Sequence, residues 1–124
     1  MEPTDLIFMT DYYADPVWTA DRNGQVELER LPIKDSLRAR IREWARRWED
    51  LALQSIEYDD VVNGMLPGPA EPVPEGAFEE LNEQGRVLCE ELRIALGDGW
   101  RVAYATFPDG RHLQWETDGP VRPG

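Results

Sequence analysis

Residues 35–51 read DSLRARIREWARRWEDL and have the clearest periodicity in the chain. Their apolar residues follow one another at steps of four, three, four and three, which places them on one face of a helix: Leu37, Ile41, Trp44, Trp48 and Leu51. Asp35 or Ser36 is suited to cap this helix, because both side chains can accept a hydrogen bond from a free backbone N–H group. We expect the helix to run to about residue 56.

A long loop and a second helix are expected next. Six Gly and Pro residues lie between positions 59 and 75, and repeated prolines exclude both a helix and a central strand. We therefore predict a loop over residues 59–75 and a second helix over residues 75–96, which Gly97 ends. Gly85 lies on the apolar stripe of the second helix, which predicts that the first helix or the sheet approaches it closely. The stripe consists of Phe78, Leu81, Gly85, Leu88, Leu92 and Leu96.

Strands are expected on both sides of the two helices. Residues 6–13 begin as a continuous apolar run and end on aromatic residues, which is typical of a buried strand, and we place it at the centre of the sheet. Residues 14–18 indicate a turn with an aromatic anchor, and residues 25–29 alternate as a short edge strand does. Residues 100–107 and 112–116 alternate around a Pro-Asp-Gly turn signal and predict a hairpin.

The expected order is a strand, an optional short strand, two helices and two further strands. This order predicts an α+β fold in which two helices pack on one face of a small mixed sheet of three to four strands. The other face of the sheet is expected to stay partly exposed. We predict a single α+β domain over residues 1–118 and a flexible C-terminal tail, rich in Gly and Pro, over residues 119–124.

The charge of the chain is concentrated in one region. The net charge is −12, and residues 57–99 carry eleven acidic residues against two basic ones. Such a concentration attracts a cationic partner. It argues against direct binding of nucleic acid, which generally needs a basic face. Surface charge also keeps small proteins soluble, so a solvated acidic face without a partner is the alternative interpretation.

Composition also bears on location. The chain has no apolar run long enough to span a membrane, and its first residues are acidic, unlike the basic start of a signal peptide. The single cysteine, Cys89, excludes an internal disulfide and fits a reducing compartment. We expect a cytoplasmic protein without a membrane partner. Twelve arginines against one lysine indicate a GC-rich bacterial genome.

Few residues are suited to catalysis. His112 and Cys89 are the only His and Cys, and neither has metal-ligand spacing around it, so we expect no metal, no cofactor and no catalytic residue. Cys89 adjoins the apolar stripe, which favours a packing role. A pair of His112 with Asp109 or Glu116 can act as acid and base. Together with Tyr104, this pair is the basis of an alternative in which the protein is a small enzyme.

The aromatic residues divide into two groups. Trp44 and Trp48 lie on the helical stripe and are predicted to be in the core. Trp100, Tyr104 and Trp115 alternate along the final hairpin and are expected to line one face of the sheet. If the helices leave that face uncovered, the three side chains form an apolar patch of the kind that marks interfaces. If the helices cover it, they are core residues, and both interpretations stay open.

Several short motifs are shared with known proteins: Trp18, Gly24, the helix entry Leu31-Pro32-Ile33-Lys34-Asp35-Ser36-Leu37, Trp44, Phe78, Gly85 and Leu88. Over about residues 6–106 they resemble a family of small, acidic, uncharacterised bacterial α/β proteins. The size, the acidity and the lack of catalytic groups are similar to those of immunity proteins and antitoxins that neutralise basic nucleases. That similarity implies a protein that acts by binding.

The leading hypothesis is a non-enzymatic binding protein that neutralises a cationic protein, such as a toxin domain. Acidic residues would contact the partner and aromatic residues would anchor it. The predicted contact residues are Glu57, Asp59, Asp60, Glu79, Glu80, Glu83, Tyr104 and Trp115. The first alternative is a structural or self-assembling homodimer that pairs through the hairpin face bearing Trp115. The others are a small enzyme that uses His112 and an acidic mimic of nucleic acid.

Overall fold

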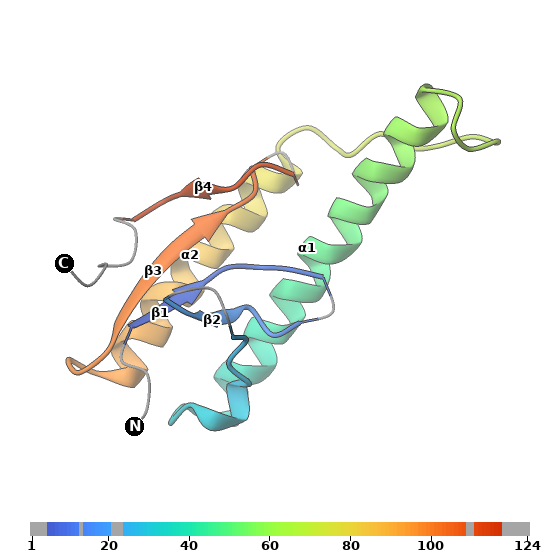
Figure 1. The fold of residues 1–124 in the computed structure, drawn as a ribbon. Coiled ribbons are helices and arrows are strands. Elements are labelled where there is room, and N and C mark those ends of the chain that lie inside the picture. The colour runs from blue at the N-terminus through green and yellow to red at the C-terminus, as the bar shows by residue number, and fades with distance from the viewer. Residues whose placement is uncertain (1–4, 13, 21–23, 109–110, 118–124) are drawn as a thin grey trace.

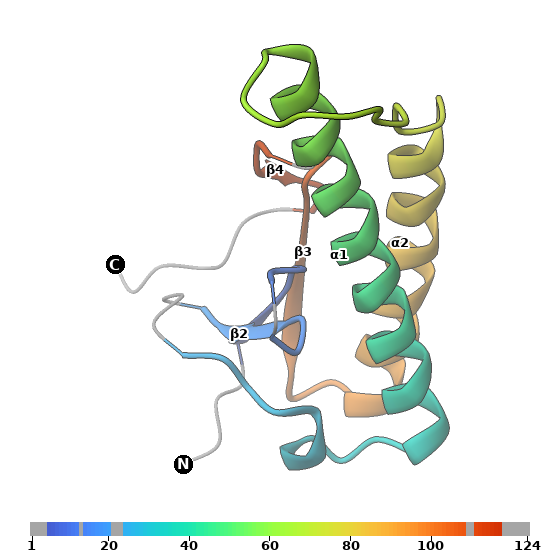
Figure 2. The same cartoon turned by 90° about the vertical axis from the view of Figure 1, so that its right-hand side faces the viewer.

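A computed structural model describes residues 5–12, 14–20, 24–108 and 111–117. Two helices lie side by side and cover one face of a four-stranded sheet, as Figures 1 and 2 show. The α+β architecture predicted from the sequence is therefore confirmed. In the described residues, neither helix is long and apolar enough to cross a membrane. The elements are β1 (Asp5–Phe8), β2 (Val17–Thr19), the 3-10 helix η1 (Leu28–Arg30), α1 (Asp35–Val62), α2 (Ala77–Leu96), β3 (Arg101–Thr106) and β4 (Gln114–Trp115).

The sheet is mixed, with the strand order β2-β1-β3-β4. β1 pairs antiparallel with β2 and parallel with β3, while β3 and β4 form an antiparallel hairpin. The predicted central position of the first strand is confirmed, because β1 is paired on both edges. This position accounts for its apolar sequence, since a strand with neighbours on both sides is largely excluded from water. Two residues of the predicted hairpin turn, Asp109 and Gly110, and the predicted tail lie outside the described residues.

The N-terminal hairpin differs from the prediction. Of the edge strand predicted over residues 25–29, only an isolated antiparallel bridge between Gln25 and Trp18 forms, and β2 lies at residues 17–19, where a turn was expected. Val26 and Leu28 are buried between exposed neighbours, so the alternation is real. Their backbone does not form a strand, because the chain turns into η1, and Leu28 N–H donates to Asp15 Oδ2 at 3.1 Å. Burial therefore alternates along residues 25–29 because Val26 and Leu28 pack into the end of the core, and not because they lie in a strand.

The start of α1 also differs from the prediction. Lys34 takes the capping position with no hydrogen bond from its side chain to the helix. Its carbonyl oxygen accepts hydrogen bonds from the N–H groups of Leu37 and Arg38, both at 3.1 Å. Asp35 is already in the first turn and forms an ion pair with Arg38. The predicted capping role of Asp35 or Ser36 is therefore wrong, and Asp35 stabilises the helix start as an acid near its positive end.

The end of α1 lies farther along the chain than predicted. The helix continues to Val62. Gly64, with φ of +77°, follows the helix and donates its N–H to the carbonyl of Val61 at 3.1 Å, while Met65 N–H donates to the carbonyl of Asp60 at 2.7 Å. These two bonds form a Schellman motif, a common glycine-dependent helix end. The first proline comes only at Pro67, so nothing stopped the helix at the predicted position.

The core between the helices and the sheet is centred on Gly85 of α2. A Cβ atom there would collide with the Tyr104 hydroxyl and the Trp44 ring, which confirms the predicted close approach. The Trp44 ring stacks on Phe8 with centroids 5.0 Å apart, and its Nε1–H donates to the carbonyl of Leu81 at 2.7 Å. Because residue 85 is glycine, the Trp44 ring of α1 and the Tyr104 side chain of β3 can pack directly against the backbone of α2.

The opposite face of the sheet carries a smaller apolar cluster. Ile7, Met9 and Ala105 are buried there, with Trp18 and Leu113 packed around them. The cluster is separate from the larger core that the helices cover. The face predicted to be partly exposed therefore has a buried apolar centre of its own.

Candidate functional site

The far end of α1 extends beyond the sheet. The buried residues of the helix end at Ala52, and residues 53–62 bury no side chain. In Figure 1 this part of the ribbon projects away from the strands at the upper right. Apolar residues that stay exposed at a helix end contribute little to the stability of the fold.

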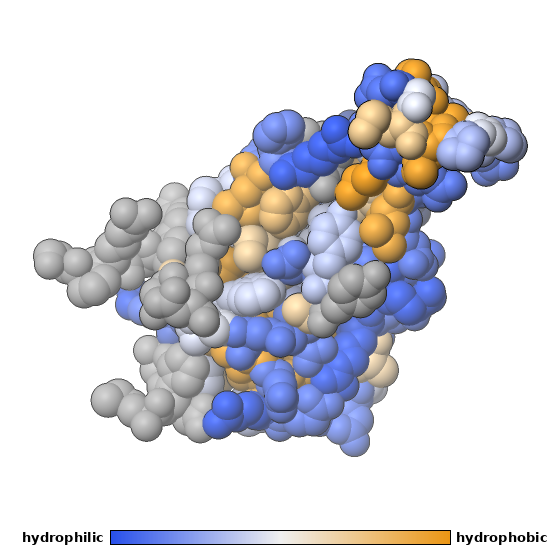
Figure 3. All heavy atoms as spheres, turned by 45° about the vertical axis from the view of Figure 1, so that its right-hand side comes forward, coloured by the Kyte–Doolittle hydropathy of each residue, from blue (hydrophilic) through white to orange (hydrophobic). Residues whose placement is uncertain are grey.

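Exposed apolar side chains are concentrated at this end. Among the described residues, eight large hydrophobic side chains are exposed, and five of them lie between residues 53 and 66. Met65 is 75% exposed and Val62 is 64% exposed. Figure 3 shows apolar residues gathered at the projecting end beside strongly hydrophilic ones. We call residues 53–66 the tip; its exposed apolar residues are Leu53, Ile56, Val62, Met65 and Leu66.

Local geometry places these apolar residues next to carboxylates. Ile56, Asp59 and Asp60 are three and four residues apart on α1, so they are neighbours on the helix surface. The Schellman motif turns the chain back over the helix end, because the carbonyl of Asp60 accepts hydrogen bonds from Met65 and Leu66. An apolar centre with a polar rim is the usual composition of a protein interface.

The carboxylates of the tip have few basic partners. No lysine or arginine occurs between Arg47 and Arg86 in the sequence. Among the described residues, Asp59 forms an ion pair with Arg111, whereas Glu57 and Asp60 form none. The negative charge of the tip is thus neutralised at one carboxylate, by an arginine that comes from the segment between β3 and β4.

The second group of predicted acids lies on α2. Glu79 and Glu80 are exposed in the first turn, where the helix dipole favours negative charge, and neither forms an ion pair with a described residue. Glu83 forms an ion pair with Arg86, which also reaches Glu116 at 3.3 Å. Since α2 begins at the end of the helical pair where α1 finishes, all six predicted acids belong to that end (Figure 2).

The proline-rich connection between the helices is held against α1. The side-chain amide of Gln54 donates to the carbonyls of Glu71 and Pro72 at 3.4 and 3.3 Å. The connection thus returns along the helix before α2 begins. This contact ties the two acidic groups into one end of the molecule.

The two aromatic residues predicted to anchor a partner lie on opposite faces of the sheet. Tyr104 faces the helices, is 1% exposed and donates its hydroxyl hydrogen to the carbonyl of Asn82 at 2.9 Å. It is a core residue, and its predicted role as a contact residue is wrong. Trp115 pairs with Ala105 in the hairpin, so it lies on the face away from the helices, and it is 37% exposed. The shared aromatic face predicted for Trp100, Tyr104 and Trp115 is therefore wrong, since Trp100 packs with Tyr104 on the helix side.

The residues considered for catalysis are not brought together. Burial raises the pKa of the Cys89 thiol to about 12, so the thiol stays protonated near neutral pH and acts as a packing residue, as predicted. His112 is exposed and Tyr104 is buried. Asp109 lies outside the described residues. The geometry of the described residues gives no support to an active site at His112.

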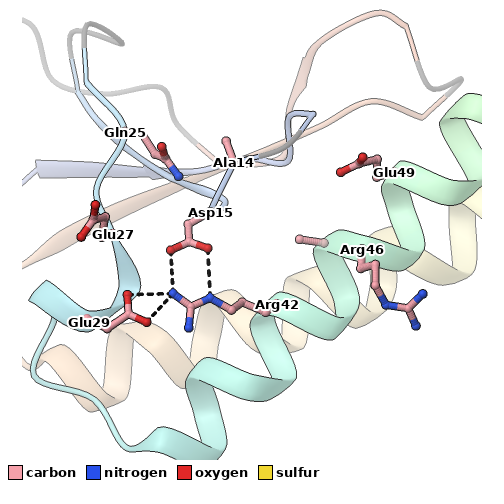
Figure 4. Close-up of a pocket in the computed structure, with 9 residues that line it drawn as sticks. Ala14, Asp15, Gln25, Glu27, Glu29, Arg42, Arg46 and Glu49 are labelled. Atoms are coloured by element: carbon pink, nitrogen blue, oxygen red, sulfur yellow. Dashed lines mark hydrogen bonds and ion pairs between the residues drawn. The ribbon is translucent and has the colours of Figure 1, made fainter.

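Away from the tip, a hollow of about 470 Å³ lies between α1, η1 and the segment before β2. Figure 4 shows Arg42 pointing from α1 toward Asp15 and Glu29. Its guanidinium donates two hydrogen bonds to Asp15, at 3.1 and 2.9 Å, and one to Glu29 at 2.7 Å. The residues around the hollow are Ala14, Asp15, Gln25, Glu27, Glu29, Arg42, Ala45, Arg46 and Glu49.

This hollow is built around an internal ion cluster. Partial burial disfavours the charged form of Asp15, but the hydrogen bonds from Arg42 and from Leu28 N–H outweigh burial and lower its pKa. The hydrogen bond from Arg42 likewise lowers the pKa of Glu29. The two carboxylates therefore join the N-terminal hairpin and η1 to α1, which is a structural role.

Sequence reasoning missed both the apolar part of the tip and the cluster around Arg42. The tip carried a usable signal, because Leu53 and Ile56 are apolar residues that fall away from the stripe of the first helix, and Gly64 supplies a helix end. The Arg42 cluster carried none, since its members are 13 and 27 residues apart along the chain.

The chain matches a known protein family. The model of the family described as Serratia CdiI immunity protein-like matches residues 4–106, which include both helices and the tip. The match ends before Arg111 and Trp115. No curated protein matches the chain. The resemblance to immunity proteins noted from the sequence is confirmed by this match.

Proposed function

The chain belongs to the Serratia CdiI immunity protein-like family, and from that premise we propose that it neutralises a cationic toxin domain by binding it with the tip. An immunity protein acts by binding its toxin. The finer parts of the proposal are the basic character of the partner and the surface that meets it. The six acids predicted from the sequence and the apolar residues of the tip form that surface.

One observation carries this proposal. The tip holds five exposed apolar side chains beside three carboxylates, two of which, Glu57 and Asp60, form no ion pair with a described residue, on a helix end that extends beyond the sheet. Burial of apolar area supplies most of the free energy of association. Exposed carboxylates contribute mainly to the rate and specificity of the encounter. The tip offers both contributions in one place.

The basic character of the partner follows from the charges. Side chains on neighbouring turns of a helix are about 5–6 Å apart. The Debye length at physiological ionic strength is about 8 Å, so Glu57, Asp59 and Asp60 act on an approaching charge together. No base lies within the tip sequence, and a cationic surface is the complement of such a field.

We further propose that the protein is not an enzyme and that it is cytoplasmic. Its family is typically non-enzymatic, and burial raises the pKa of this chain's one thiol, Cys89, to about 12, so the thiol stays protonated and is a poor nucleophile near neutral pH. The single cysteine is consistent with a reducing compartment.

We expect the toxin domain to be encoded beside this chain in its genome, and the test uses that domain in a form without catalytic activity. The variant Glu57→Lys with Asp60→Lys changes the net charge by four units at the tip. The control variant Glu27→Lys with Asp98→Lys changes it by the same amount at exposed acids elsewhere that form no ion pair with a described residue. Titration calorimetry gives the dissociation constants. Circular dichroism shows whether each variant is folded.

We expect the tip variant to bind at least about tenfold more weakly than the control, since close charge pairs couple by about 1.5 kcal/mol or more. Lysines at the end of a helix suit its dipole, so the tip variant should remain folded. If both variants bind equally well, the acids of the tip are bystander charge and the proposed surface is wrong.

A further inference from the structure

An arginine of the chain itself already occupies part of the tip. Arg111 lies between β3 and β4, 52 residues from Asp59 in sequence, and its guanidinium forms an ion pair with the Asp59 carboxylate. Among the described residues it is the one base that pairs with a carboxylate of the tip. A partner that approaches Asp59 therefore finds the Arg111 guanidinium already bound to that carboxylate.

The pair is exposed on both sides. The side chain of Arg111 is 44% exposed and that of Asp59 is 41% exposed. Exposed ion pairs of this kind stabilise a protein little, because water and salt screen them and two long side chains lose freedom. The pair is thus weak enough to exchange for another pair without loss of the fold.

The geometry points to Arg111 as an internal substitute for a partner guanidinium: on binding, an arginine of the toxin displaces Arg111 and takes its place on Asp59. This inference rests on the proposed function, since it assigns a binding step to the same tip. It also names the chemical group that the tip selects, which is an arginine guanidinium and not merely a positive charge of any kind.

The choice of arginine follows from the occupant. Asp59 already accepts hydrogen bonding from a planar guanidinium, which matches a carboxylate better than a lysine ammonium does. Glu57 and Asp60 are near Asp59 in sequence and add negative charge around it, but side chains one or two residues apart do not share a helix face, so Asp59 is the acceptor of the partner arginine. Arg111 uses one of these three carboxylates and leaves the other two without a base.

Arg111 also lies within electrostatic reach of Tyr12. Burial raises the pKa of Tyr12, the charges of Asp11 and Glu49 raise it further, and the charge of Arg111 opposes them. The Tyr12 ring packs against Trp48 of α1, with ring centroids 5.3 Å apart and the rings tilted by 51°. The surroundings of Arg111 therefore include a group of the chain other than Asp59.

The experiment compares two single substitutions against the same inactive toxin domain. Arg111→Gln frees Asp59. Arg101→Gln is the matched control, because Arg101 also pairs with an aspartate, Asp5, at 2.8 Å, and it starts β3 at the opposite end of the sheet from Arg111. Both substitutions make the net charge more negative by one unit, so long-range attraction changes equally.

We expect Arg111→Gln to bind about two- to fivefold more tightly than Arg101→Gln, the range of an exposed ion pair that no longer has to be broken. Asp59→Asn should weaken binding about tenfold, because it removes a charged hydrogen-bond acceptor. In the Asp59→Asn background the gain from Arg111→Gln should vanish, since no carboxylate is left to free.

Two outcomes would overturn the inference, and they are distinguishable. If Arg111→Gln binds no better than Arg101→Gln while Glu57→Lys with Asp60→Lys still loses affinity, the exchange is wrong and the proposed function stands. If the tip and control charge reversals bind equally, the proposed surface fails and the exchange fails with it.

Discussion

Ile56 and Asp60 lie one helical turn apart on the part of α1 that extends beyond the sheet, and neither side chain is buried. Burial of an exposed apolar side chain in a complex is favourable, because it removes apolar surface from water. We infer that a partner covers Ile56 and the apolar residues around it. The first prediction tests that interpretation.

Truncating the apolar part of the tip should weaken toxin binding without weakening the fold. We expect Ile56→Ala with Met65→Ala to lower affinity about tenfold or more, mainly through faster dissociation, because central apolar contacts hold complexes together. Ile94→Ala on α2, which is 74% exposed, is the control and should bind as the native chain does. Surface plasmon resonance measures both rate constants. Equal dissociation rates for the two variants would remove the tip as an anchor.

Gly85→Ala should destabilise the protein. The added methyl group would collide with the Trp44 ring and the Tyr104 hydroxyl, both fixed by hydrogen bonds to α2. Overpacking of this kind costs about 1–3 kcal/mol in free energy of unfolding, which urea denaturation measures. Gly99→Ala is the control, because open space surrounds that position. A Gly85→Ala protein as stable as the control would mean that the core adjusts freely.

The Arg42 cluster should make stability depend on acid pH. The pKa of Asp15 is lower in the folded chain than in the unfolded one, so its contribution is present above about pH 4 and is lost as pH falls through the folded value. We expect the thermal midpoint to fall below about pH 4. Asp15→Asn should have a lower midpoint at pH 7 and a shallower decline in acid.

Glu27→Gln is the control for the pH experiment. Glu27 lines the same hollow but is not among the acceptors of Arg42. Its midpoint should follow the native profile from pH 7 to pH 3. If Asp15→Asn instead declines in parallel with the native chain, other carboxylates carry the acid dependence and the cluster does not.

Self-association is the main alternative to a toxin partner, and Trp115 is the residue on which it depends. We expect the chain to be a monomer at high concentration, since the proposed binding needs no second copy. Size-exclusion chromatography with light scattering measures the mass. A dimer that Trp115→Ser converts to a monomer would instead support assembly through the hairpin face.

The helices and the sheet were largely predictable because their signals are local. The apolar stripe of α1 and the glycine at position 85 each reflect a contact whose period or size shows in the sequence. The end of α1 was predicted at about residue 56, but neither glycine nor proline occurs between residues 57 and 63, and the helix continues until Gly64 forms its end. The three-residue strand β2 was missed because its pairing with β1, a long-range contact, defines it.

The site was predictable in charge but not in shape. The sequence shows that bases are missing from one stretch, and this is why Glu57 and Asp60 were singled out. It does not show how far the sheet extends along α1, so it could not reveal that Leu53 and Ile56 lie beyond it. The pairing of Arg111 with Asp59 depends on the final fold and has no sequence signal.

Hydrogen–deuterium exchange on the chain with and without the inactive toxin domain tests the central claim most directly. The account predicts slower exchange of backbone amides at residues 53–66 and in the first turns of α2 when the toxin is bound. The hollow around Arg42 and the C-terminal half of α2 should exchange as before. Protection confined to those two regions, with the tip unchanged, would contradict the account.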